Sequence, residues 1–117
     1  MKNEPIIFTS RDETLRIAPQ AIVYFEADGN YTHIVTANHF RMSVCMNLGS
    51  VEKYIAANFP DEHARFIRVG KQIVVNVDHV LQVNVLKQKL VLSDGMTFAF
   101  TLDASKDALK KLQKLLV

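Results

Sequence analysis

The first quarter of the chain alternates short apolar runs with polar turn residues, a pattern typical of β-strands. Two runs, 6–9 and 14–17, flank a polar cluster at 10–12, which predicts a β-hairpin. A third run, 22–27, ends at Asp28-Gly29-Asn30, residue types that suit a turn requiring positive φ. We therefore expect the chain to reverse direction there.

The next two segments extend this pattern into a small sheet. β-Branched and aromatic residues dominate 31–36, and 40–44 alternates apolar and polar positions with period two. Together with 22–27, these segments predict a three-strand meander. Cys45 follows the last strand within an apolar pattern, so we expect its thiol to be buried.

Two segments carry apolar residues at helical spacing. Asn47 is a good N-cap for a short amphipathic helix that ends near residue 58, before Pro60. The second helix starts at Asp103 or Ser105 and is amphipathic, with lysines on one face. Its apolar stripe consists of Leu109, Leu112, Leu115 and Leu116.

The second half of the chain carries further strand candidates at 74–75, 80–86, 90–92 and 97–102, with Ser93-Asp94-Gly95 as a hairpin turn. No internal repeat, low-complexity tract or linker interrupts the pattern. The fold class predicted is mainly β with short helices, and we expect residues 1–117 to form a single domain with its core at about 6–117.

Composition agrees with one ordinary intracellular domain. The chain has 117 residues, 49% hydrophobic and 22% charged, enough for one core and too few for two full domains. Its single cysteine excludes an internal disulfide, which favours a reducing, cytoplasmic setting. No apolar run approaches the roughly 20 residues of a membrane helix, and the N-terminus lacks the apolar stretch of a signal peptide.

The charge is unevenly placed, although its sum is only +2. Residues 1–64 hold five Lys or Arg and eight Asp or Glu, a net of −3, whereas residues 65–117 hold nine and four, a net of +5. This polarity suits a face that meets DNA, RNA or an anionic membrane. The alternative is that lysines merely solvate the last helix, but Arg65, Arg68 and Lys71 cluster outside any helical pattern.

Motifs for catalysis, metals or cofactors are missing from the sequence. The four histidines, at 33, 39, 63 and 79, form no close pair, and no G-x-S-x-G elbow is present. The four glycines are scattered singly, which excludes a glycine-rich phosphate loop. We therefore expect no enzyme activity, no catalytic residues, no metal site and no cofactor; a small hydrolase or metal enzyme would require the histidines to converge in space.

The order of several motifs resembles the LytTR-type DNA-binding domain of bacterial response regulators. The resemblance covers about residues 6–117, and its most specific parts are 24–27 with 29–32, and 66–69 with Val75-Asn76. It implies an elongated arrangement of small antiparallel sheets with short helices, whose loops and strand ends enter the major groove of duplex DNA. It further implies that the domain binds specific DNA sequences to regulate transcription, and that two copies bind together on repeated DNA sites. It also implies a place in two-component signalling, with a receiver domain or a sensor kinase as partner.

The resemblance also implies which residues contact DNA. They come from the start of the strand at 31–36, from the run at 68–72 and from the last helix. Asn30 has a structural alternative as a turn former, and Arg68 has one as the partner of a carboxylate. The implied residues are Asn30, Thr32, His33, Arg68, Lys71, Gln72 and Lys106.

Two positions depart from the family pattern. Gly70 stands where a histidine is common, which removes a contact and is expected to loosen the loop. Asp103 stands where a basic residue is usual, so its charge would repel phosphate unless Lys106 compensates. These departures favour an alternative function, a LytTR-like regulatory or protein-interaction module with weak or no DNA binding.

Overall fold

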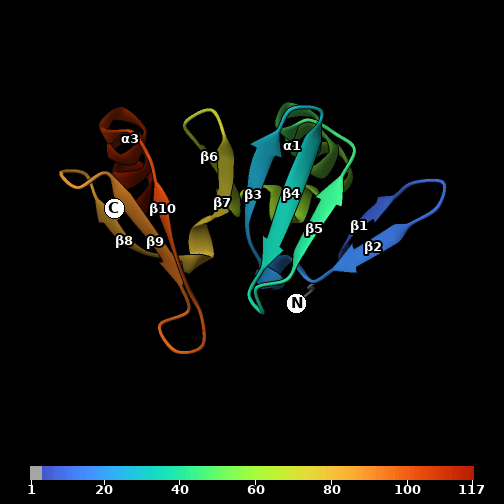
Figure 1. Ribbon diagram of the computed structural model, residues 1–117, viewed down its shortest axis with the longest axis horizontal. Coiled ribbons are helices and arrows are strands. Elements are labelled where there is room, and N and C mark those ends of the chain that lie inside the picture. The colour runs from blue at the N-terminus through green and yellow to red at the C-terminus, as the bar shows by residue number, and fades with distance from the viewer. Residues whose placement is uncertain (1–3) are drawn as a thin grey trace.

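A five-stranded antiparallel sheet lies at the centre of the computed structural model, which describes residues 4–117 and measures 44 × 32 × 24 Å (Figure 1). The strand order is β5-β4-β3-β7-β6. The meander predicted from the sequence forms one half of this sheet. Its strands are β3 (Ile22–Asp28), β4 (Tyr31–Thr36), β5 (Arg41–Val44), β6 (Phe66–Val69) and β7 (Ile73–Asn76).

Smaller units lie on either side of the central sheet. On one side are the hairpin of β1 and β2, the helix α1 and the single-turn helix α2; on the other are a second sheet of order β10-β9-β8 and the helix α3 (Figure 1). Short 3-10 turns, η1 (Pro19–Ala21) and η2 (Val77–His79), precede β3 and β8. The bounds are β1 (Ile6–Thr9), β2 (Thr14–Ile17), α1 (Leu48–Asn58), α2 (Pro60–His63), β8 (Val80–Asn84), β9 (Lys89–Ser93), β10 (Ala99–Asp103) and α3 (Lys106–Leu116).

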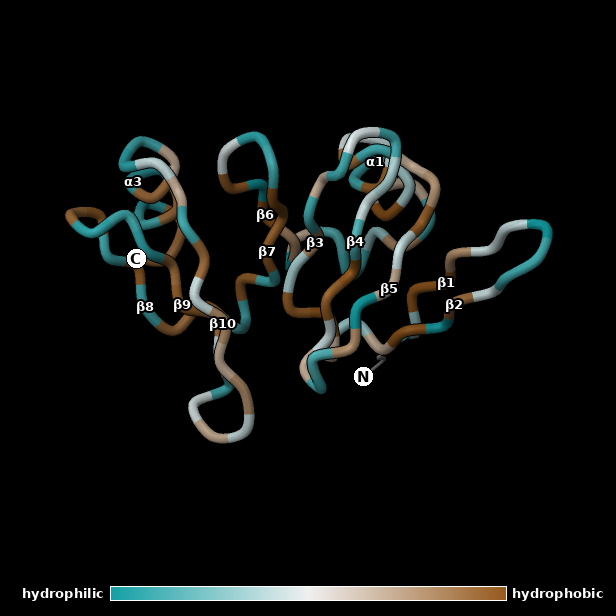
Figure 2. Tube along the Cα trace, in the orientation of Figure 1, coloured by the Kyte–Doolittle hydropathy of each residue, from teal (hydrophilic) through white to brown (hydrophobic). Residues whose placement is uncertain are grey.

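Both faces of the central sheet are covered by a hydrophobic cluster. Phe25 and Ile34 pack in one cluster with Val51 of α1, and Val75 packs in the other with Leu109 of α3. Because both faces are buried, the inner strands β3 and β7 read as continuous apolar runs rather than as strict alternation. In Figure 2 the brown of hydrophobic residues accordingly follows these strands, whereas the teal of hydrophilic residues is found on the connections along the upper edge.

Most predicted elements are confirmed. The hairpin of β1 and β2 has the predicted bounds, and Gly29 takes the expected positive φ, 62°, between β3 and β4. Asn47 caps α1, because its side chain accepts a hydrogen bond from the Ser50 amide at 2.8 Å. The arrangement of three small antiparallel sheets with a C-terminal helix is the fold class expected from the sequence.

Two strand predictions need correction. The residues of β6 were not predicted as a strand, because four residues with one charged member carry too little pattern by themselves. The strand expected from residue 97 starts at Ala99 instead. Asp94 accepts hydrogen bonds from the amides of Met96, Thr97 and Phe98, which lengthens the connection from a tight turn into a loop.

Two burial predictions also need correction. Leu109 and Leu112 are buried, but Leu115 and Leu116 are 63% and 43% exposed, because α3 packs only its first half against the sheets. Cys45 is exposed rather than buried. It follows β5 on the side away from the core, since its neighbours Val44 and Met46 are the ones that pack against the cluster around α1.

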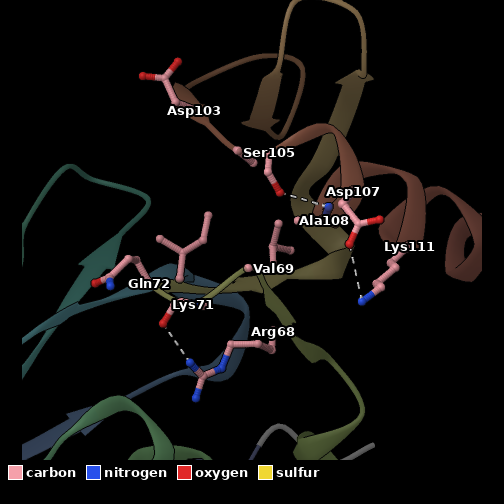
Figure 3. Close-up of a pocket in the computed structure, with 12 residues that line it drawn as sticks. Arg68, Val69, Lys71, Gln72, Asp103, Ser105, Asp107, Ala108 and Lys111 are labelled. Carbon is pink, nitrogen blue, oxygen red and sulfur yellow. Dashed lines mark hydrogen bonds and ion pairs between the residues drawn. The ribbon is translucent and has the colours of Figure 1, made fainter.

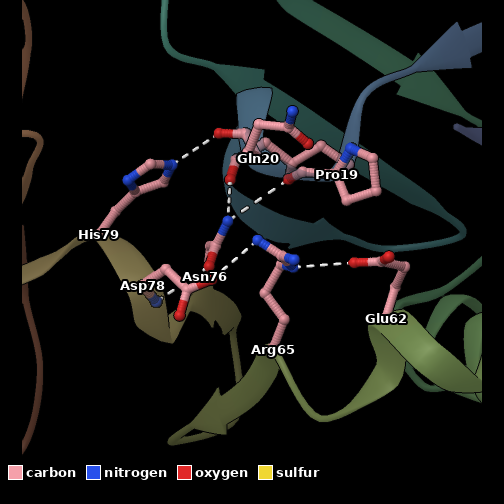
Figure 4. A network of polar contacts seen from close by, with 8 residues as sticks. Pro19, Gln20, Glu62, Arg65, Asn76, Asp78 and His79 are labelled. Carbon is pink, nitrogen blue, oxygen red and sulfur yellow. Dashed lines mark hydrogen bonds and ion pairs between the residues drawn. The ribbon is translucent and has the colours of Figure 1, made fainter. Parts of the chain in front are cut away.

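A polar network fixes the end of the sheet where β3 begins and β7 ends (Figure 4). The fully buried Asn76 donates to the carbonyl of Ile22 at 2.9 Å and accepts from the Asp78 amide at 3.0 Å. Arg65 bridges the carboxylates of Glu62 and Asp78, at 2.9 and 2.7 Å. Arg65 is therefore engaged in structure, and it does not belong to one cationic surface with Lys71.

Candidate nucleic-acid interface

Three connections meet at the opposite end of the molecule, along the upper edge in Figure 1. They are the β3–β4 turn (29–30), the β6–β7 turn (70–72) and the β10–α3 junction (104–105), which we call the loop end. The Ala27 amide donates to the Gln72 carbonyl at 2.8 Å, which joins the first two connections. A groove of about 680 Å³, lined by residues of the β6–β7 turn and of α3, joins the second and third (Figure 3).

Arg68 joins the backbone of the β6–β7 turn to helix α1. Arg68 Nη1 donates to the Lys71 carbonyl at 2.9 Å, and its Nε and Nη2 donate to Glu52 Oε1 of α1 at 3.1 and 2.5 Å. Gly70 adopts φ +70°, and a Cβ placed there would lie 3.9 Å from the Ala108 Cβ of α3. Glycine therefore supplies the left-handed conformation that the turn adopts.

Thr32 does not fit the DNA-contacting role implied by the resemblance. Its side chain is fully buried, and Oγ1 donates to the Met46 carbonyl at 2.8 Å. The next residue, His33, has an 18% exposed side chain whose two ring nitrogens lie 2.7 Å from Asp28 Oδ2 and 2.7 Å from Ser43 Oγ. These two residues thus have partners within the domain: Thr32 joins β4 to the segment after β5, and His33 joins β4 to the end of β3 and to β5.

Asn30 stands at the exposed apex of the same turn. Gly29 adopts the positive φ, and Asn30 does not, so the turn does not depend on an asparagine at this position. The neighbouring Tyr31 is 51% exposed. The apex therefore presents one amide and one phenol to an approaching ligand.

The acidic side chains beside the loop end all have partners within the domain. Asp28 contacts His33, Asp107 contacts Lys111 at 3.7 Å, and Asp103 contacts Lys89, which lies directly opposite it on β9. The expected repulsion of phosphate by Asp103 is thus offset by a cation that the sequence pattern did not point to.

Two lysines in or beside the loop end have no acidic partner within the described residues. Within residues 4–117, Lys71 and Lys106 take part in no ion pair, and both side chains are exposed. Lys71 lies in the β6–β7 turn and Lys106 is the first residue of α3. An exposed lysine without an ion pair therefore lies in or directly beside two of the three connections of the loop end.

A further ion pair lies beside His33 on the face of the central sheet. Arg41 donates to Glu26 at 2.8 Å, and this hydrogen bond raises the pKa of the Arg41 guanidinium. Burial and the nearby Glu26 carboxylate raise the pKa of Tyr24. Glu26 and Asp28, two carboxylates at one strand end, are therefore held by separate partners and form no acid–base pair.

The positioning partners Glu52 and Lys89 were not found by sequence reasoning. Glu52 precedes Arg68 by 16 residues and comes from a helix, so no local spacing connects them. Lys89 would have followed from the register of β9 with β10, since it is the residue opposite Asp103.

In the described part of the chain, no group of three or more His, Cys, Asp or Glu is arranged to hold a metal ion. No helix formed by residues 4–117 is long and apolar enough to cross a membrane.

Comparison with known proteins agrees with this arrangement. Residues 12–117 match the LytTr DNA-binding domain family. A solved structure described as the LytTr DNA-binding domain of a response regulator from Bacillus cereus superposes with a TM-score of 0.63 at 17% sequence identity, and the match covers 98% of each chain. A comparison with curated proteins gave no match.

Proposed function

The chain belongs to the LytTR family of DNA-binding domains, and we propose that it binds duplex DNA sequence-specifically through its loop end to regulate transcription. DNA binding for regulation is the property of the family. The observation that supports the proposed surface is that Lys71 and Lys106 are both exposed and, within residues 4–117, take part in no ion pair. Cations of this kind neutralise backbone phosphates, which supply most of the affinity for DNA.

The dimensions of the molecule suit this role. The longest axis is 44 Å, whereas one turn of duplex DNA rises about 34 Å. The three connections follow this axis in Figure 1. Neighbouring strands lie about 4.8 Å apart, so the β3–β4 and β6–β7 turns fit together within one major groove, which is about 12 Å wide. The α3 junction then lies over the phosphates beside that groove.

The proposed contacts divide by chemistry. Lys71 and Lys106 neutralise phosphates, and the amides of Asn30 and Gln72 face base edges. Arg68 and His33 are proposed as positioning residues and Thr32 as a core residue that supports the fold, because their polar atoms are engaged within the domain.

One observation favours a second candidate function, a protein-interaction module. Helix α3 and strand β8 line a groove of about 730 Å³ that combines exposed apolar side chains, Leu81 (60% exposed) and Leu116 (43%), with charged ones such as Lys110. Contacts of this kind would join two copies on repeated DNA sites, or the domain to a receiver domain of a two-component system. A module that acts only through such contacts would leave DNA unbound.

Selection from a random duplex library separates the two candidates. The proposed function predicts that the domain retards a subset of duplexes and that the selected sequences share a motif, repeated at a fixed spacing if two copies bind. Retardation of no duplex, together with capture of a protein through the β8–α3 groove, would favour the interaction module.

A further inference from the structure

Three polar side chains from the neighbouring strands β3, β4 and β5 form a continuous chain of hydrogen bonds (Figure 1). His33 on β4 lies directly opposite Ser43 on β5, and its Nδ1 is 2.7 Å from Ser43 Oγ. Its other ring nitrogen, Nε2, is 2.7 Å from Asp28 Oδ2 at the end of β3. Asp28 shares this face of the sheet because it stands two residues beyond Glu26, the residue opposite His33. The order of groups is therefore hydroxyl, imidazole and carboxylate.

The carboxylate of Asp28 determines which nitrogen of a neutral His33 carries the proton. An ionised carboxylate only accepts hydrogen bonds, so Nε2 is the donor to Asp28. Nδ1 then has a free lone pair, and the Ser43 hydroxyl donates to it. The two nitrogens exchange the roles that they have in serine hydrolases, where Nε2 faces the serine. Because Ser43 is exposed, a general base lies within hydrogen-bond reach of a hydroxyl that a reagent can approach.

A cavity beside Ser43 indicates which reagent the hydroxyl would meet. Its volume is about 360 Å³, which is within the range of small-molecule sites. The Tyr54 hydroxyl in its wall already donates to the Ile7 carbonyl, so the aromatic ring is what this residue offers to a ligand. The other apolar side chains of the wall are Phe8, Leu15, Val44 and Met46. Such a cavity accommodates an apolar acyl group next to the hydroxyl.

From this geometry we propose that Ser43 is a site of covalent acylation by an activated ester or thioester that carries an apolar acyl group. Ser43 Oγ forms a new ester bond to the carbonyl carbon, and the hydroxyl proton passes to His33 Nδ1. The bond from that carbon to the leaving oxygen or sulfur then breaks, and the leaving group takes the proton from His33. His33 is a catalytic residue in this step, because it touches the reacting hydroxyl, and Asp28 is a positioning residue. This site does not rest on the proposed function.

The test follows acylation of the full chain by p-nitrophenyl hexanoate, in a Cys45→Ala background that removes the neighbouring thiol. We expect peptide mass spectrometry to locate the hexanoyl group on Ser43, and Ser43→Ala to lose it. Ser10 lines the same cavity, but its hydroxyl donates to the Glu13 carbonyl at 3.4 Å, so it should stay unmodified. Ser50→Ala, the same change at an exposed serine of α1, is the matched control and should leave the rate of acylation unchanged.

Three further variants test the roles of His33 and Asp28. A general base contributes about 100- to 10,000-fold, so His33→Gln should slow acylation of Ser43 by roughly 100-fold or more. Asp28→Asn should also slow it, because an amide can donate to Nε2 and thereby favour the tautomer with its proton on Nδ1. Asp28→Glu keeps a carboxylate and should recover most of the rate, which a merely structural role of Asp28 would not predict.

Thermal unfolding of each variant checks that the compared chains are folded. Acylation that is confined to Ser43 and depends on His33 supports the inference. Equal acylation of Ser43 and Ser10, acylation of lysines or tyrosines alone, or an undiminished rate in His33→Gln overturns it. A hexanoyl ester that reacts no faster than the acetyl ester overturns the assignment of an apolar acyl group. Because the assay contains no DNA, these outcomes are independent of whether the domain binds DNA.

Discussion

Arg68 on β6 donates two hydrogen bonds to a single carboxylate oxygen of Glu52 on α1, at 3.1 and 2.5 Å. Its remaining nitrogen donates to the Lys71 carbonyl at 2.9 Å. The guanidinium thus links a helix, a strand and the β6–β7 turn. Its charge is balanced inside the domain, so we assign Arg68 to positioning of the turn rather than to phosphate contact.

Replacing this ion pair by a neutral pair tests the assignment. In the double variant Arg68→Met, Glu52→Gln, the turn loses its support while the net charge stays the same. Ordering about one residue on binding costs 1–2 kcal/mol, so we expect DNA affinity to fall roughly tenfold. The slope of log affinity against log salt should not change. A slope reduced by about 0.9 would mean that Arg68 contacts a phosphate directly.

The substitution Thr32→Val should lower the free energy of unfolding without changing the affinity for DNA. The valine has the same shape but cannot donate to the Met46 carbonyl, which then loses this partner. We expect the free energy of unfolding in urea to fall by about 1–2 kcal/mol. DNA affinity of the folded variant should match wild type. Thr101→Val, at an exposed position of β10, is the control and should change stability little. A stable Thr32→Val domain with weakened DNA binding would contradict the buried role.

Gly70 offers a test of the turn itself. Alanine has room at this position, since its Cβ would approach only Ala108, at 3.9 Å, but φ is +70°. The left-handed conformation costs a non-glycine residue about 1–2 kcal/mol, and asparagine tolerates it better than alanine. Thermal unfolding should therefore rank the domain as wild type, Gly70→Asn and Gly70→Ala, from most to least stable. Equal stability of the two variants would contradict the conformational explanation.

The free energy of unfolding should depend on pH because of the Asp94 carboxyl. Hydrogen bonds from the Thr97 hydroxyl and from the amides of Met96 and Thr97 hold the pKa of the Asp94 carboxyl well below its usual range. A carboxyl with a lowered folded-state pKa stabilises the fold above its unfolded pKa, about 3.9, and this stabilisation is lost as pH falls through the folded value.

Urea unfolding of wild type and Asp94→Asn at several pH values measures this effect. We expect wild type to be the more stable protein at pH 6 and its advantage to shrink steadily below about pH 4. An advantage that is independent of pH would show that the charge of Asp94 does not hold the loop.

Local patterns in the sequence predicted much of the fold. The polar cluster between β1 and β2, the glycine between β3 and β4 and the Asn47 cap each act within a few residues. Such features fix the backbone through local sterics and hydrogen bonds, so sequence alone reveals them. The strand β6 escaped prediction because its four residues become a strand only through pairing with β7.

The candidate site was harder to predict for the same reason. Lys71 and Gln72 are exposed as expected, but the burial of Thr32 depends on Met46, 14 residues away. The partner of Arg68 likewise comes from α1. Whether a polar side chain faces a ligand or the domain itself is decided by contacts distant in sequence, which one sequence does not display.

The salt dependence of DNA binding tests the central claim most directly. Affinity for a fixed duplex is measured by fluorescence anisotropy between about 50 and 200 mM salt for wild type, Lys71→Ala and the control Arg16→Ala, which removes an exposed charge on β2 outside the loop end. If the loop end binds DNA, Lys71→Ala weakens binding and lowers the log–log slope by about 0.9, whereas Arg16→Ala changes neither. Equal slopes for wild type and Lys71→Ala, or a loss confined to Arg16→Ala, would contradict the account.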